Sequence, residues 1–75
     1  METYANLSGR SGIRRFEIRS NGIVVEFKGR ARYFYSTSRP GTSAVNEMKR
    51  LAIEGVGLNT YISKYVGDRY SRKMR

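Results

Sequence analysis

The chain of 75 residues contains no cysteine, no histidine and no tryptophan, and its single proline is Pro40. Without cysteine there is no disulfide, and no thiolate is available as a nucleophile or metal ligand. Without histidine the chain lacks the side chain that most often serves as a general base and as a metal ligand. We therefore expect a protein that is not an enzyme and needs no cofactor or metal.

Long hydrophobic runs are also missing. No apolar stretch approaches the ~20 residues that a membrane-spanning helix needs. Residues 1–6 include an acid and lack an apolar core, so they do not have the pattern of a signal peptide. We expect no membrane partner and a cytoplasmic location, with which a chain free of cysteine is consistent.

Acidic residues are few, and the chain has six of them. On the elements predicted below they fall on solvent-facing sides or at element ends, and no two converge in a pocket. They are Glu2, Glu17, Glu26, Glu47, Glu54 and Asp68. This pattern also argues against catalysis.

Positive charge dominates instead. Fifteen Lys and Arg face six Asp and Glu, which gives a formal charge of +9, and eleven of the fifteen are arginine. The guanidinium group is a planar fork that binds phosphate and stacks on bases. The charge balance therefore predicts a polyanionic partner, most simply a nucleic acid. The alternative is that the charge keeps a small protein soluble and that arginine reflects a GC-rich genome.

Three segments show the alternation of apolar and polar residues that is typical of half-buried strands, namely 13–19, 23–28 and 31–36. Between the first two, Asn21-Gly22 predicts a tight hairpin turn with positive φ angles. Gly29 gives the second connection the same freedom. Such short connections predict a three-stranded antiparallel β-meander, which needs a covering layer to be stable.

After Pro40 the hydrophobic period changes from 2 to 3.6, which predicts helices over 43–54 and 59–66. Gly55-Val56-Gly57 has the glycines of a turn between helices, and we do not interpret it as a phosphate-binding loop because it follows no strand. Each predicted helix has one apolar stripe, so both are expected to pack on the apolar face of the meander.

The predicted fold class is therefore α+β, a three-stranded antiparallel β-meander followed by two helices packed on one face, in the order βββαα. No strand is expected after Ser43. We expect one domain over 13–70, preceded by a flexible lead of 1–12 and followed by a basic tail of 71–75. The residues predicted to be largely buried are Val25, Phe27, Met48, Leu51, Tyr61, Ile62 and Tyr65.

Four motifs, taken in order, resemble the KTSC domain family. They are Ser11-Gly12-Ile13, Ile23-Val24-Val25-Glu26-Phe27, Tyr33-Phe34-Tyr35 and Gly57-Leu58-Asn59-Thr60-Tyr61-Ile62-Ser63-Lys64, followed by Tyr70. That family is a small domain named after the C-terminus of some lysyl-tRNA synthetases and also found alone in bacterial and phage proteins. The resemblance implies the same α+β fold. Through its association with the synthetases it favours RNA over DNA as the partner.

A stripe of cations lies on or beside the predicted solvent side of the meander, and its members are Arg15, Arg19, Lys28, Arg30 and Arg32. Such a stripe can follow a phosphate backbone. Alternation turns Phe34 outward beside these arginines, where an exposed ring can stack on a base. The alternatives are a solvated face whose field is weakened by Glu17 and Glu26, and a Phe34 that packs under the N-terminal arm or a partner chain.

Two further groups of residues leave the partner's position open. Tyr33 and Tyr35 form either a stacking platform or part of the core, and alternation with Val25 and Phe27 favours the core. The tail cations form either a phosphate-binding arm or a solubilising end. They are Arg69, Arg72, Lys73 and Arg75.

The sequence thus predicts a small basic binding domain that contacts nucleic acid through arginines and an exposed aromatic, with RNA favoured over DNA. The alternative is a protein-interaction module of phage or prophage origin that docks on an acidic partner.

Overall fold

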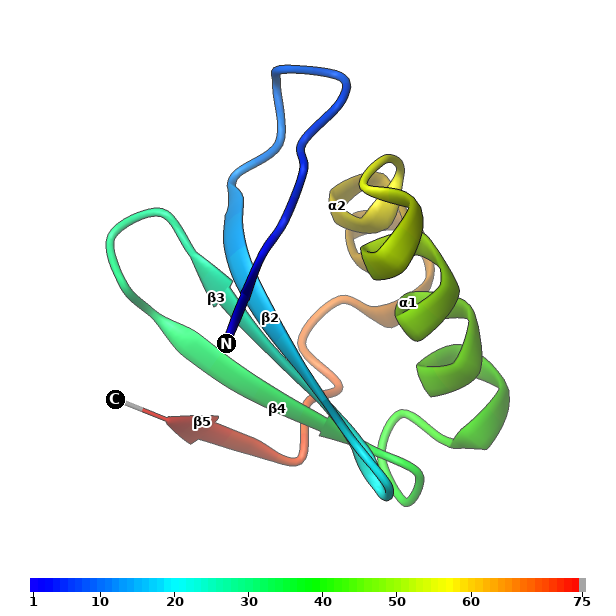
Figure 1. Cartoon of the computed structure of the whole chain (residues 1–75). Coiled ribbons are helices and arrows are strands. Elements are labelled where there is room, and N and C mark those ends of the chain that lie inside the picture. The colour runs from blue at the N-terminus through cyan, green and yellow to red at the C-terminus, as the bar shows by residue number, and fades with distance from the viewer. Residues whose placement is uncertain (75) are drawn as a thin grey trace.

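The computed structural model describes residues 1–74, which form one antiparallel sheet of five strands with helices on one face (Figure 1). The strands follow one another across the sheet in chain order. They are β1 (Glu2–Thr3), β2 (Ile13–Arg19), β3 (Gly22–Phe27), β4 (Arg32–Ser36) and β5 (Arg72–Met74). The helical segments are α1 (Thr42–Glu54), α2 (Leu58–Tyr61) and η1, a π-helical stretch (Ile62–Val66). The fold is α+β as predicted, but the sheet has five strands and not three.

The central meander of β2, β3 and β4 is confirmed, and the predicted strand ends agree with the observed ones to within one residue. Phe16 pairs with Val25, and Val25 pairs with Tyr33, so these three side chains form one row across the helix-covered side. A bulge between Ile13 and Arg15 adds one residue to β2. Because of it, Ile13 joins Phe16 in the core although the two are three residues apart.

Residues 1–12, which the sequence predicts to be a flexible lead outside the domain, contribute a strand and a buried side chain to it. β1 pairs with β2, and Tyr4, which directly follows it, is only 3% exposed. The Tyr4 hydroxyl accepts a hydrogen bond of 3.3 Å from the backbone N–H of Leu58. This contact ties the start of the chain to the start of α2, so the segment adds to the core.

The expectation that no strand follows Ser43 is wrong, because β5 pairs with β4 near the C-terminus. The backbone N–H of Ser71 donates to the carbonyl of Phe34 at 2.7 Å, and the ring of Tyr70 packs against Tyr33. These contacts hold the chain beside β4 although β5 has no hydrophobic pattern of its own. Arg75, which we had counted with the tail, lies outside the described residues.

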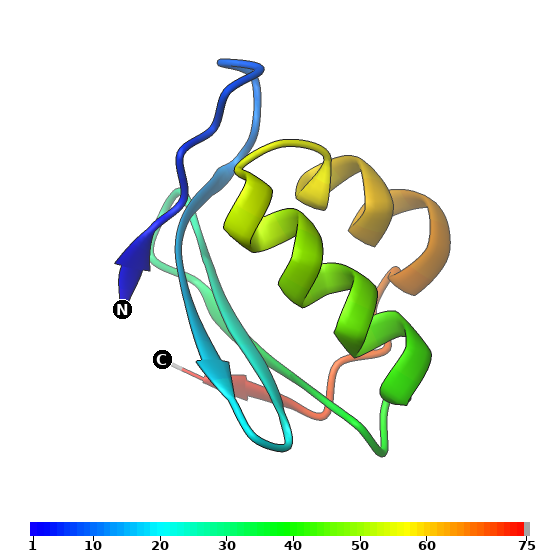
Figure 2. The ribbon, with the colours of Figure 1, turned by 45° about the vertical axis from the view of Figure 1, so that its right-hand side comes forward.

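Helix α1 lies side by side with α2 and η1 over the same face of the sheet (Figure 2). Gly55 and Gly57 make the turn between them with φ angles of +80° and +87°, as the glycine spacing predicted. Apolar side chains of the helices and of the sheet meet between the two layers, where Val25, Met48 and Leu58 are fully buried. Within residues 1–74, no helix has the length and apolar character required to cross a bilayer.

The predicted core is confirmed in part. Val25, Met48 and Ile62 are buried, whereas Phe27, Leu51 and Tyr61 are only partly buried and pack at its edge.

Tyr65 is wrongly assigned to the core, since it is 61% exposed. The backbone N–H of Gly67 donates to the carbonyl of Ile62, five residues back, which widens this last helical turn. The wider turn rotates Val66 inward to 2% exposure and leaves Tyr65 on the outside.

Candidate nucleic-acid interface

One face of the sheet has no described helix on it, and we call it the open face. Strand pairing arranges its side chains in three rows across the sheet. The first row is Thr3, Arg15, Glu26, Arg32 and Met74, the second is Glu17, Val24, Phe34 and Arg72, and the third is Arg19, Gly22 and Ser36. Four of the predicted binding residues share this face as alternation predicted, and β5 adds a fifth, Arg72.

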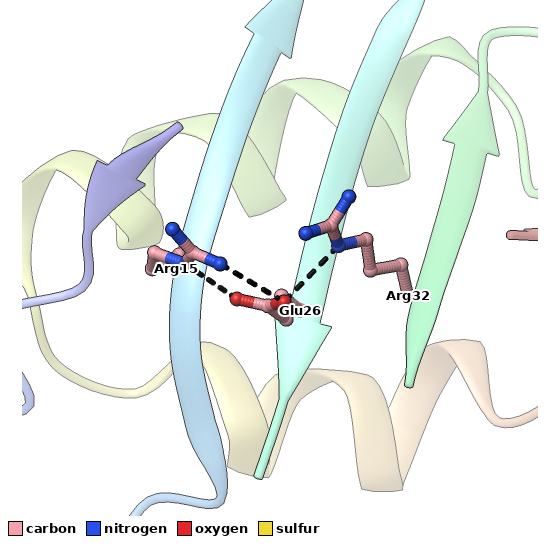
Figure 3. A network of polar contacts seen from close by, with 3 residues as sticks. All are labelled: Arg15, Glu26 and Arg32. Atoms are coloured by element: carbon pink, nitrogen blue, oxygen red, sulfur yellow. Dashed lines mark hydrogen bonds and ion pairs between the residues drawn. The ribbon is translucent and has the colours of Figure 1, made fainter. Parts of the chain in front are cut away.

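Glu26 lies at the centre of the open face, between Arg15 and Arg32 (Figure 3). Arg15 donates from Nε to Oε1 at 2.5 Å and from Nη2 to Oε2 at 3.2 Å. Arg32 donates from Nε to Oε2 at 3.0 Å. The Glu26 side chain is 0% exposed, while those of Arg15 and Arg32 keep 38% and 37% of their area in solvent. Three donors therefore satisfy a buried carboxylate, and two guanidinium groups lie over it.

The charge state of this network follows from its hydrogen bonds. The guanidinium of Arg15, helped by that of Arg32, lowers the pKa of Glu26 to about 2 against the opposing effect of burial. At neutral pH the three groups therefore carry a net charge of +1. Glu26 therefore offsets one of the two positive charges, and the same carboxylate fixes where both guanidinium groups point.

Phe34 occupies the next row and is half-buried. The guanidinium carbon of Arg19 lies 5.6 Å from the centroid of its ring, within the range of a cation–π contact. Arg19 also donates from Nε to Glu17 at 2.7 Å, which lowers the pKa of that carboxylate. On the other side, Arg72 is directly paired with Phe34 across β4 and β5. The ring thus has cationic neighbours from two strands.

Gly22 makes room for this ring. A Cβ at Gly22 would lie 2.8 Å from a ring carbon of Phe34 and would collide with the carbonyl of Tyr35. The expected positive φ in this hairpin is absent, because Ser20 and Asn21 form the two-residue turn and neither has one. The glycine is therefore needed for close approach between β3 and β4, and not for the turn.

Several cations of residues 1–74 form no ion pair, and some of them lie on β5 and in the turn between β3 and β4. No carboxylate of residues 1–74 forms an ion pair with Arg72, Lys28 or Arg30. Lys28 and Arg30 are exposed in the turn between β3 and β4, where Gly29 and Arg30 both have positive φ. These side chains are available to an anionic ligand without breaking an ion pair within the described chain.

Two predicted binding residues lie away from the open face. Lys73 is paired with Tyr33, on the helix-covered side, and its ammonium is 5.8 Å from the Tyr33 ring centroid. Arg69 turns back on the end of η1, where its guanidinium donates to the carbonyls of Tyr65 and Val66. The fourth tail cation, Arg75, is outside the described residues.

Beside β4, on the helix-covered side, lies an aromatic hollow that we call the tyrosine pocket. It has a volume of about 350 Å³, and its walls include Phe27, Tyr33, Tyr35, Ile62, Asp68 and Tyr70. The ring centroids of Tyr33 and Tyr70 are 4.7 Å apart, and those of Tyr35 and Tyr70 are 6.4 Å apart. Burial raises the pKa of Tyr35 above its usual range.

Sequence reasoning did not find this pocket as a site. Alternation correctly turned Tyr33 and Tyr35 toward the helices, and Tyr35 is buried at 2% exposure. Tyr70 and Asp68 reach the same place only because β5 returns to pair with β4. The sequence contained a usable signal in the Tyr33-Phe34-Tyr35 run and the distant Tyr70. It did not show on which side of the sheet Tyr70 joins the other two tyrosines.

Comparisons with known proteins return no match, whether to family models, to curated proteins or to solved structures. The resemblance to the KTSC family accordingly stays a prediction. Among residues 1–74 there is also no group of three acidic, cysteine or histidine side chains arranged to hold a metal ion.

Proposed function

We propose that the protein is a binding domain for single-stranded nucleic acid, RNA ahead of DNA, and that it has no catalytic role. The nucleic acid lies on the open face, with phosphates at the arginines and one base on Phe34. RNA is favoured on the strength of the resemblance quoted above.

The observation that carries the proposal is the position of Phe34 between Arg19 and Arg72 on a sheet face that no described helix covers. Stacking on an aromatic side chain contributes about 1–3 kcal/mol per base and tolerates any sequence. Arg15 on β2 and Arg32 on β4, held in place by Glu26, extend the cationic surface along these two strands. Arginines next to an aromatic ring are a combination that can bind phosphate and base together.

The test is the fluorescence anisotropy of a labelled single-stranded RNA octamer, titrated between 25 and 200 mM salt. Each phosphate contact contributes a slope of about −0.7 in log K against log salt for single strands. Replacing Arg19 and Arg72 together with alanine should therefore reduce the slope by about 1.4. A matched control replaces Arg50 and Lys64, two exposed cations of the helical layer, and should leave the slope unchanged.

Phe34→Leu separates stacking from charge. Leucine still covers Val24, the apolar partner of this position on β3, but it has no aromatic ring on which a base can stack. Affinity should fall about tenfold while the salt slope stays the same, because stacking releases few counterions.

If neither RNA nor DNA octamers bind at the lowest salt, where the electrostatic attraction is strongest, the proposal is wrong. The alternative of docking on an acidic protein surface then takes its place.

A further inference from the structure

We propose that the tyrosine pocket binds one unpaired guanine of the RNA, and that Arg30 and Lys73 bind the phosphate attached to it. This inference rests on the proposed function and adds a second, base-selective site on the opposite side of the sheet.

The shape and lining of the pocket suit a flat aromatic ligand. Its volume of about 350 Å³ lies within the range of small-molecule sites, and it is open to solvent on one side. Three tyrosine rings and Phe27 line it, with Phe27 and Tyr33 in edge-to-face contact at 5.7 Å. Bases stack on such rings in single-stranded RNA recognition.

An aromatic cage can also hold an organic cation, but charge argues against that here. The ammonium of Lys73 already lies 5.8 Å from the Tyr33 centroid and takes up its cation–π contact. A second cation would have to enter beside it in a chain of formal charge +9. A neutral base with an anionic phosphate has the complementary charge.

The phosphate has its own place next to the pocket. A second hollow of about 460 Å³ is lined by Gly29, Arg30, Ala31, Lys73 and Met74, and Ala31 belongs to both hollows. Its two cations form no ion pair with a carboxylate of residues 1–74. A nucleotide whose base enters the pocket can therefore reach two free cations with its phosphate.

Asp68 supplies the preference for guanine. An ionised carboxylate only accepts hydrogen bonds, and it has two oxygens to do so. Guanine presents two adjacent donors, N1–H and the N2 amino group, on its Watson–Crick edge. Adenine, cytosine and uracil each offer only one donor there, next to an acceptor that a carboxylate repels. Asp68 stands in the pocket wall and makes no ion pair with the other described residues.

The two sites are connected around the edge of the sheet. Arg72 lies on the open face opposite Phe34, and its neighbour Lys73 lies on the helix-covered side opposite Tyr33. β5 is the outermost strand and has only three residues. An RNA strand can therefore pass from Phe34 over β5 and place a following base in the tyrosine pocket.

The inference is tested first with mononucleotides, by following backbone amide resonances in ¹⁵N NMR spectra. GMP should shift the amides of Ala31, Gly67 and Asp68 and should bind about tenfold more tightly than AMP, CMP or UMP. Asp68→Asn should remove that preference, because an amide offers one acceptor and one donor. Equal responses to all four nucleotides, or an unchanged preference in Asp68→Asn, would overturn the inference.

Two further variants probe the ring and the phosphate. Tyr70→Phe should bind GMP like the parent, Tyr70→Leu should bind it about tenfold more weakly, and the exposed Tyr65→Leu is the matched control that should have no effect. Arg30→Asn tolerates the positive φ of that turn and removes the charge. It should reduce the advantage of GMP over guanosine, with Lys73 left to hold the phosphate; if the advantage is unchanged, the assigned phosphate site is wrong.

Octamers separate this inference from the function on which it rests. If an all-adenine octamer and one with a central guanine bind equally, with the expected salt slope and no pocket shifts, the pocket inference fails and the open-face proposal stands. If GMP shifts the pocket amides but no octamer binds at low salt, the open-face proposal fails and the base site remains.

Discussion

The two faces of the sheet are held together by different forces. On the helix-covered side, apolar side chains such as Ile23, Met48 and Leu58 are fully buried against one another. On the open face, the fully buried centre is the Glu26 carboxylate, beneath Arg15 and Arg32. Apolar packing responds little to pH or salt, whereas an ion network responds to both.

This difference shows that the cations of the chain are not equally available to a ligand, because some are paired with carboxylates that the formal charge of +9 already counts. Arg15 and Arg32 share Glu26, Arg19 holds Glu17, and Arg50 bridges two carboxylates on α1. Among the cations with no carboxylate partner in residues 1–74, four lie at the β3–β4 turn and on β5, namely Lys28, Arg30, Arg72 and Lys73. These four can bind phosphate without giving up an ion pair, whereas the paired arginines are held in place by their carboxylates.

The largest effect is expected from the apolar side. Met48→Ala removes a fully buried side chain between α1 and the sheet, and should lower the free energy of unfolding by about 2–5 kcal/mol. The loss should be the same at pH 7 and at pH 4, and urea unfolding followed by circular dichroism measures it. Met48→Leu, which nearly conserves volume, should cost less than about 1.5 kcal/mol. A cost as small for alanine as for leucine would mean that α1 does not pack as described.

The open face is tested by acid. The pKa of Glu26 is about 2 in the folded protein and ordinary in the unfolded chain, so the unfolded chain binds more protons between these values. The stabilisation by the network is complete above about pH 4.5 and is lost as pH falls toward 2. Glu26→Gln should therefore unfold at lower urea than the parent at pH 7, and the gap between them should narrow below pH 4.5.

Glu17→Gln is the matched control for that experiment, because Glu17 lies on the same face and its side chain is 41% exposed. At pH 7, the difference in urea concentration at half-unfolding between Glu17→Gln and the parent should be smaller than the difference for Glu26→Gln. Parallel pH profiles for the parent and Glu26→Gln would contradict the description of the open face as an ion network.

The sequence predicted these two faces unequally. Alternation along β2, β3 and β4 is a local pattern, so it correctly separated Arg15, Arg32 and Phe34 from Val25 and Tyr35. The pairing of Glu26 with two arginines depends on the register between strands, which no single strand encodes. Glu26 had accordingly been interpreted only as a charge that weakens the cationic stripe.

The ends of the chain were beyond prediction for a related reason. β1 and β5 have two and three residues, too few for any periodicity to be recognised. Their place in the sheet comes from contacts made by neighbouring residues. The buried Tyr4 is hydrogen-bonded to the start of α2, and Tyr70 packs beside Tyr33. As a result Lys73 was grouped with Arg72 in one arm, although the strand turns the two to opposite faces.

The smallest effect is expected at Tyr65, where the helical layer departs from its sequence pattern. A core tyrosine at this position would cost about 3–5 kcal/mol when changed to alanine, as large aromatic residues do. In the structure its ring lies outside, 61% exposed and 5.2 Å from that of Tyr61. Tyr65→Ala should therefore change the free energy of unfolding by no more than about 0.5 kcal/mol.

Val66→Ala gives the contrast in the same urea titration, because Val66 is 2% exposed and faces the sheet through the widened turn. It should destabilise the protein clearly more than Tyr65→Ala does. The reverse order would mean that η1 is an ordinary α-helical turn with Tyr65 inside, and that the helix-covered face is packed as the unbroken 3.6-residue stripe predicts.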